Sequence, residues 1–85
     1  MRESERPQPA LGLAIRQLRI KRGAKQQDIA DASNITRRSL SFIENGGANP
    51  TWATLLDIAA ALEVPMSELA KMAEKLHVDE PPATK

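Results

Sequence analysis

Apolar residues recur every three or four positions along most of this chain, which is the spacing of one face of an α-helix. In the first such stretch, Leu11, Ile15 and Leu18 share a face. No segment alternates apolar and polar residues as a half-buried strand does. The pattern therefore predicts an all-α fold with five helices, at 10–22, 26–32, 37–45, from 51 onward and at 66–76.

Residues that begin or end helices stand at the boundaries of these segments. Gly23 follows the first helix, and Asn34 tolerates the left-handed conformation that a tight turn needs. Thr36 and Thr51 each offer a side-chain oxygen that can cap a helix N-terminus. Pro65 suits the first turn of the last helix, because a proline lacks only an N–H that would have no partner there.

The stretch QQDIADASNITRRSLSFIENG, residues 26–46, is the most informative part of the chain. It predicts two short helices that meet at a sharp turn. The second helix places Leu40 and Ile43 on its buried face. Its outer face is basic and polar, as in proteins that present a helix to the major groove of DNA. The outward residues are Arg38, Ser41, Phe42 and Asn45.

With its flanks, this stretch resembles the helix-turn-helix of the Cro/C1-type repressor family, also called the XRE family. The matching segments are LGLAIRQLRIKRG, QQDIA, ITRRSLSFIENG and NPTWATLLDIAAALEVPMSEL, from about residue 11 to residue 69 without gaps. The resemblance implies a lambda-repressor-like, five-helix DNA-binding domain over 10–76, with the helix-turn-helix proper at 26–45. The chain departs from the family at Lys25, where Ser or Thr is usual, at Asn34 and Glu63, where Gly is usual, and at Phe42, where a polar residue is usual.

The resemblance also implies roles for single residues. Arg19 and Glu44 are expected to form a partly buried ion pair between the first and third helices. Gln26, at the start of the second helix, is expected to contact a phosphate. A large apolar residue at the position of Trp52 is expected to pack the preceding loop onto the core.

Charge is unevenly distributed, although the net formal charge is only +1. Residues 10–46 contain seven basic and three acidic residues, a balance of +4, and residues 47–85 contain three basic and six acidic residues, a balance of −3. The uneven distribution gives the molecule a candidate DNA-facing side. Residues 1–9 and 77–85 are polar and rich in proline, and we expect them to be a disordered arm and tail.

Two sets of residues are candidates for contact with DNA. Arg is the usual reader of guanine, and residues at the start of a recognition helix reach base edges. The alternative for the two arginines is contact with phosphate alone. For Phe42 the alternatives are packing over the loop near Trp52 or contact with another subunit, and for Asn45 a helix C-terminal cap. The predicted base contacts are Arg37, Arg38, Ser39, Ser41 and Phe42, and the predicted phosphate contacts are Lys25, Gln26, Thr36, Asn45, Asn49 and Thr51.

The sequence gives little support to catalysis or to a bound cofactor or metal. His77 is the only histidine, there is no cysteine, and no Gly-rich phosphate-binding loop is present. No apolar run is long enough to span a membrane and no signal peptide opens the chain, so we expect a cytoplasmic protein.

The expected function is sequence-specific DNA binding by a transcription regulator, as a homodimeric repressor on a palindromic operator. A surplus of apolar residues on the first and last helices predicts the dimer interface, from Leu13, Ile20, Leu69, Met72 and Leu76; the alternative is that these residues pair within one chain. An antitoxin with a toxin partner, or a restriction–modification controller, is an alternative of the same type. A helical protein-interaction module without a DNA role is the alternative from another class.

Overall fold

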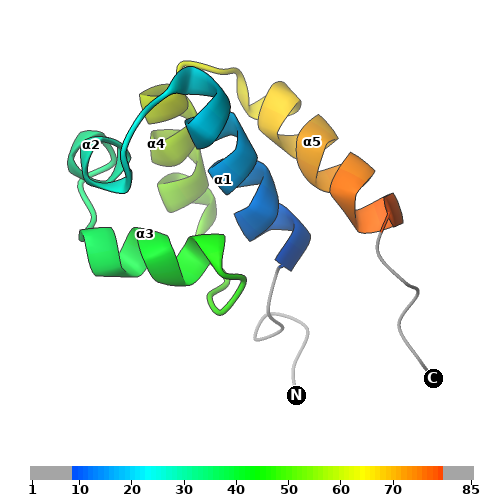
Figure 1. Cartoon of the computed structure of the whole chain (residues 1–85), viewed down its shortest axis with the longest axis horizontal. Coiled ribbons are helices and arrows are strands. Elements are labelled where there is room, and N and C mark those ends of the chain that lie inside the picture. The colour runs from blue at the N-terminus through cyan, green and yellow to red at the C-terminus, as the bar shows by residue number, and fades with distance from the viewer. Residues whose placement is uncertain (1–8, 80–85) are drawn as a thin grey trace.

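The computed structural model describes residues 9–79, and most of the arm and tail that we expect to be disordered lies outside them. The described chain folds into five helices and contains no strand (Figure 1). The predicted all-α, five-helix fold is therefore confirmed. The helices are α1 (Pro9–Arg22), α2 (Gln26–Ala32), α3 (Arg37–Glu44), α4 (Trp52–Leu62) and α5 (Met66–Asp79).

The first four helices end in the same way. A residue in the left-handed region follows each helix closely, and its N–H bonds back to a carbonyl of the last turn. The next residue donates its N–H to the carbonyl five positions earlier, which completes a Schellman motif. The left-handed residues are Gly23, Asn34, Gly46 and Glu63, with φ of 78°, 60°, 80° and 61°.

The beginnings of α3 and α4 are capped by threonines, as predicted. Thr36 Oγ1 accepts a hydrogen bond from the Ser39 N–H at 3.0 Å, and Thr51 Oγ1 accepts one from the Thr54 N–H at 3.1 Å. Lys25 precedes α2 where the family has Ser or Thr, and its side chain makes no capping hydrogen bond. Instead, the Asp28 carboxylate accepts from the Lys25 backbone N–H at 3.2 Å.

Three helix ends differ from the prediction. Helix α1 begins at Pro9, because proline is tolerated in a first turn, and α3 ends at Glu44 with Asn45 as its C-cap. Helix α5 continues past the predicted end at residue 76 to Asp79. The prediction ended this helix where its apolar stripe ends, at Leu76, but the helical backbone continues for three more residues.

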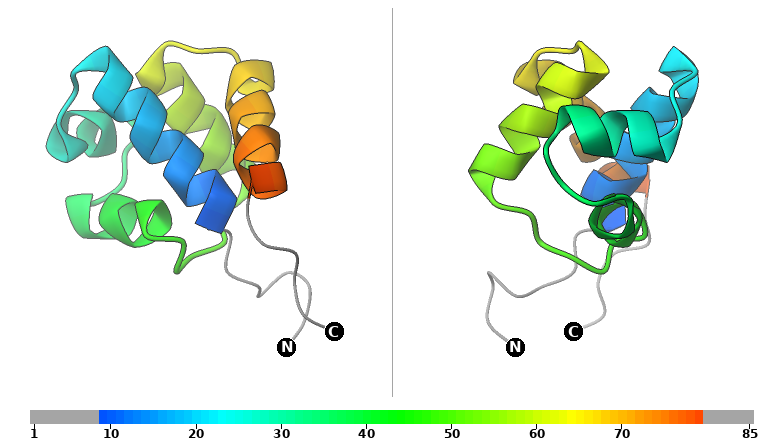
Figure 2. Two further views of the ribbon diagram at one scale, coloured as in Figure 1. Left: turned by 45° about the vertical axis from the view of Figure 1, so that its right-hand side comes forward. Right: turned by 90° about the vertical axis from the view of Figure 1, so that its left-hand side faces the viewer.

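All five helices contribute to one hydrophobic core. Helices α1 and α5 lie side by side, and α4 packs behind them (Figures 1 and 2). Leu69 is fully buried in this core, so its predicted place in a dimer interface is wrong. The buried core residues are Ala14, Ile15, Leu18, Ile29, Ala30, Leu40, Ile43, Ile58, Ala59, Leu62 and Leu69.

Trp52 does not pack against this core as predicted, and 64% of its surface is exposed. It is the first residue of α4, and the inward face of that helix is formed by Ile58, Ala59 and Leu62. The smaller Ile35 and Ala48 are packed against the core. The indole ring therefore lies at the surface, and Leu56, four residues later on the same helix, is also exposed.

Candidate DNA-binding surface

Helices α2 and α3 and the turn between them form a helix-turn-helix. In the right-hand view of Figure 2, α3 is seen nearly end-on, with α2 lying across it. The turn depends on Asn34, whose N–H donates to Asp31, and on Ile35, whose N–H donates to Ala30 at 3.0 Å. Helix α3 lies at one end of the helical body, where its outer face is open.

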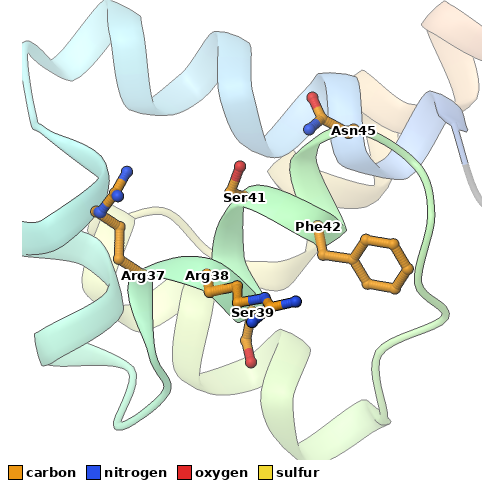
Figure 3. Close-up of a pocket in the computed structure, with 6 residues that line it drawn as sticks. All are labelled: Arg37, Arg38, Ser39, Ser41, Phe42 and Asn45. Carbon is orange, nitrogen blue, oxygen red and sulfur yellow. The ribbon is translucent and has the colours of Figure 1, made fainter.

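The two faces of α3 have opposite character. Leu40, Ile43 and Glu44 are buried against the other helices. Six side chains on the remaining surface line one open depression along the helix (Figure 3). All five predicted base-contacting residues are among them, together with Asn45. The six are Arg37, Arg38, Ser39, Ser41, Phe42 and Asn45.

Phe42 is exposed over 57% of its surface, as its position on the outer face predicted. Its ring points toward the loop that follows α3 (Figure 3). A Cβ atom placed on Gly47 would lie 2.5 Å from Phe42 Cε1, so the ring lies directly over that glycine. The Phe42 ring thus packs over the loop, which the sequence had left as an alternative, and much of its surface is exposed as well.

The predicted phosphate-contacting residues lie at helix ends on both sides of α3. Lys25 and Gln26 stand at the start of α2, where the helix dipole favours an anion. Asn49 and Thr51 line a second depression, which shares Ser39 and Phe42 with the first. Thr36 and Asn45 cap the two ends of α3.

Beneath this surface, Glu44 is held in the predicted ion pair. Arg19 Nε lies 2.7 Å from Glu44 Oε2, and Arg19 Nη2 lies 3.0 Å from Oε1. Arg19 also donates to the carbonyl of Ala24 at 3.0 Å. The guanidinium therefore joins α1 to the end of α3 and to the segment that leads into α2.

Gln26 takes part in the same network, which sequence reasoning did not anticipate. Its Nε2 donates to Glu44 Oε1 at 3.0 Å. An amide nitrogen carries two hydrogens, so one N–H of Gln26 remains for another acceptor. The only sequence signal for this bond is that residues 26 and 44 stand at the two outer ends of the helix-turn-helix.

A second ion pair at the surface also went unpredicted. Arg22 Nη2 lies 2.7 Å from Glu63 Oε2, and Arg22 Nη1 donates to the Leu62 carbonyl at 3.4 Å. The hydrogen bond from Arg22, and then its positive charge, holds the pKa of the Glu63 carboxyl below its ordinary value. The pair joins the end of α1 to the end of α4.

Residues 9–79 hold no group of three or more His, Cys, Asp and Glu residues that could bind a metal ion. None of the helices in this part of the chain combines the length and the apolar character needed to cross a membrane.

Comparison with known proteins identifies the family. The sequence model of the helix-turn-helix family HTH_3 matches residues 15–69, which is more than half of the chain. The chain therefore belongs to the helix-turn-helix family, and the resemblance seen in its sequence is confirmed.

Two curated relatives are similar over the same region. The chain is 39% identical over 57 residues to the HTH-type transcriptional regulator SutR of Escherichia coli, and 33% identical over 66 residues to the competence pilus inhibition repressor of Acinetobacter baylyi. The matches cover 67% and 78% of this chain but only 32% and 60% of those relatives. The chain thus spans about a third of one relative's length and about three fifths of the other's.

A solved structure with a similar fold is the restriction-modification controller protein C.AhdI from Aeromonas hydrophila. The TM-score is 0.70 at 30% sequence identity, over 72% of this chain and 92% of that one. The likeness extends over most of the helical domain.

Proposed function

We propose that this protein is a sequence-specific DNA-binding transcription regulator, and that it acts as a repressor. The observation that carries the proposal is the exposed face of α3, where six side chains line one depression and five are polar. Arg37 and Arg38 stand at the start of the helix, which is the part that reaches base edges when such a helix enters the major groove. An arginine there donates two hydrogen bonds to O6 and N7 of guanine.

The DNA backbone would be held on both sides of α3. On one side, Lys25 supplies charge and Gln26 supplies its second amide hydrogen, whose direction is fixed because Glu44 holds the first. On the other side, Asn49 and Thr51 stand at the start of α4. Phosphate contacts of this kind set the register of the protein on the duplex, while the residues of α3 select the sequence.

The regulator would bind a palindromic operator as a homodimer. Leu13 and Ile20 are 39% and 57% exposed on the outer side of α1, which leaves apolar surface uncovered in one chain. On α5, Met72 and Leu76 are partly exposed although they pack against the core. We propose that these four residues contribute to the subunit interface. Two copies related by twofold symmetry would place half-sites about one helical turn, roughly 10 bp, apart.

A restriction–modification controller is the second candidate, and the likeness to C.AhdI favours it. Both candidates use the same DNA-reading surface and work in the cytoplasm, where a bacterial-type regulator meets its operator. They differ in which promoters carry the operator. Mapping the sites bound in the source genome separates them, because a controller would occupy sites beside restriction and methylation genes.

Selection of bound sequences from random double-stranded DNA tests the proposal. We expect a symmetric sequence to be enriched, and its affinity to fall linearly with salt on a log–log plot, since phosphate contacts release counterions. A helical protein-interaction module would enrich no sequence, and its binding to DNA would not rise above background at physiological salt.

A further inference from the structure

Gly47 differs from the residues that occupy the same place in the other three Schellman motifs. This place is the residue directly after the left-handed one, and its N–H donates to the carbonyl five positions earlier. For Gly47 the acceptor is the carbonyl of Phe42, at 3.0 Å. An apolar side chain at this place commonly packs back against its helix. Ala24, Ile35 and Val64 fill that role at the ends of α1, α2 and α4 and pack against the core. Gly47 has no side chain to do so.

The ring of Phe42 occupies the space that a side chain of Gly47 would take. A Cβ on Gly47 would lie 2.5 Å from Cε1 and 3.0 Å from both Cδ1 and Cζ of that ring. These distances are well inside van der Waals contact, so any larger residue at position 47 displaces the ring. Because the ring is the far end of a side chain that can rotate about χ1 and χ2, the ring would turn away from the loop.

The backbone gives no other reason for a glycine at position 47. The neighbouring Gly46 has a φ of 80°, which favours glycine for conformational reasons, whereas Gly47 is not among the residues with positive φ. What excludes a larger residue at position 47 is the Phe42 ring. Replacement of Gly47 by alanine therefore alters the position of that ring without straining the chain.

The ring stands where two depressions of the DNA-facing surface meet. One runs along α3, and the other lies between α3 and the loop that leads to α4. Phe42 and Ser39 line both. One side of the ring is packed on the loop, and the exposed remainder projects between the arginine-rich face and the start of α4 (Figure 3).

We propose that Gly47 is a positioning residue for base recognition, because it seats the Phe42 ring on the loop so that the exposed edge contacts the methyl group of a thymine. The thymine methyl is the apolar feature of the major groove, and a phenylalanine side chain is suited to contact it. A ring already held in one rotamer loses little further conformational entropy when DNA binds. The inference rests on the proposed DNA-binding function and adds a residue that does not touch DNA itself.

The first experiment compares duplexes that carry thymine or uracil, which differ by the methyl group alone. The probe is the operator selected from random DNA, with each thymine replaced in turn, and the protein is the full chain. We expect wild type to lose about fourfold in affinity at one symmetric position, the worth of one buried methyl-sized group. Phe42→Ala should bind both duplexes equally. Gly47→Ala should also lose most of the discrimination, and Phe42→Ala/Gly47→Ala should match Phe42→Ala alone.

The second experiment observes the ring without DNA. Phe42 is the only phenylalanine in the chain, so 4-fluorophenylalanine labelling gives a single fluorine resonance. We expect Gly47→Ala to shift this resonance while the thermal unfolding midpoint stays close to that of wild type. Gly23→Ala is the control, since it strains a left-handed position with no atom within 4 Å of the added Cβ. It should lower the midpoint and leave the resonance unchanged.

The outcomes separate the inference from the function beneath it. If no sequence is enriched in the selection, the DNA-binding proposal itself fails. If an operator is found but Phe42→Ala retains every thymine preference, the methyl contact is wrong and DNA binding stands. If Gly47→Ala moves the fluorine resonance yet keeps the preference that Phe42→Ala removes, or leaves the resonance in place, the positioning role of Gly47 is overturned.

Discussion

The guanidinium of Arg19 donates hydrogen bonds to both carboxylate oxygens of Glu44, at 2.7 and 3.0 Å, and the Glu44 side chain is almost wholly buried. This pair lies directly beneath the proposed DNA-reading helix. Through Gln26 it also reaches the start of α2. One buried carboxylate thus ties together the helix that would read bases, the helix end that would bind phosphate, and α1.

Loss of the Glu44 charge should be strongly destabilising. Glu44→Gln leaves Arg19 without its anionic partner in a site that excludes water, and removal of one member of a buried pair costs about 3–5 kcal/mol. The measurement is the free energy of unfolding in urea. Glu74→Gln, at an exposed position on α5, is the matched control and should change stability little. A loss of only a few tenths of a kcal/mol for Glu44→Gln would contradict the burial described here.

The close approach of α1 to α3 predicts a second destabilising change. A Cβ on Gly12 would collide with the carbonyl oxygen of Ile43 and lie 2.8 Å from that of Glu44. Gly12→Ala must therefore push the helices apart, and overpacking of this kind costs about 1–3 kcal/mol. Gln17→Ala, at an exposed position of the same helix, should be close to neutral. Equal stability of the two variants would show that α1 and α3 are farther apart than described.

The exposed pair Arg22–Glu63 predicts a pH dependence. The pKa of the Glu63 carboxyl is lowered in the folded state, so the pair contributes stability above the unfolded carboxyl pKa and loses it as pH falls through the folded value. Glu63 also has a φ of 61°, which glycine adopts at less cost. Glu63→Gly should therefore gain stability relative to wild type as pH falls from about 6 to about 3.

Thermal unfolding midpoints across that range provide the check. Glu63→Gln separates the two effects, because it removes the charge and keeps the left-handed backbone. Its difference from wild type should shrink toward acid pH. A Glu63→Gly variant whose difference from wild type is the same at every pH would show that the ion pair adds no stability.

The proposed subunit interface predicts a change of mass in solution. Ile20→Asp places a charge on exposed apolar surface of α1, so it should leave the fold intact and convert a dimer into a monomer. Sedimentation beside a circular dichroism spectrum measures both properties. Leu56→Asp, at an exposed position of α4, is the control. If Leu56→Asp dissociates the dimer and Ile20→Asp does not, the interface lies on α4 beside Trp52.

Local sequence signals were sufficient for the helices and for the outer face of α3. Helical spacing placed Leu40 and Ile43 inside and Phe42 outside, because one face of α3 packs against α1 and α2 while Phe42 lies on the exposed face. The side of Trp52 could not be predicted in this way. It depends on which residues near the loop before α4 pack against the core, and here these are the smaller Ile35 and Ala48.

Two other features were not predicted because they too depend on how elements pack against one another. The burial of Leu69 depends on how closely α5 approaches α1, and the Gln26–Glu44 bond depends on how α2 meets α3. Both are packing distances between helices, which periodicity within one helix does not encode. The ring of Phe42 was predicted to be exposed, but its packing on Gly47 was not. That packing is possible because the residue five positions later has no side chain.

Base reading by α3 is the central claim, and the affinity of Arg38→Ala for single-base variants of the selected operator tests it most directly. Lys71→Ala, on the exposed side of α5, serves as the control and should bind every duplex as wild type does. If Arg38 reads a guanine, the variant should lose about 1–3 kcal/mol on the operator and should no longer distinguish the bases at one symmetric pair of positions. Equal weakening of Arg38→Ala on all duplexes, with every base preference retained, would contradict the account.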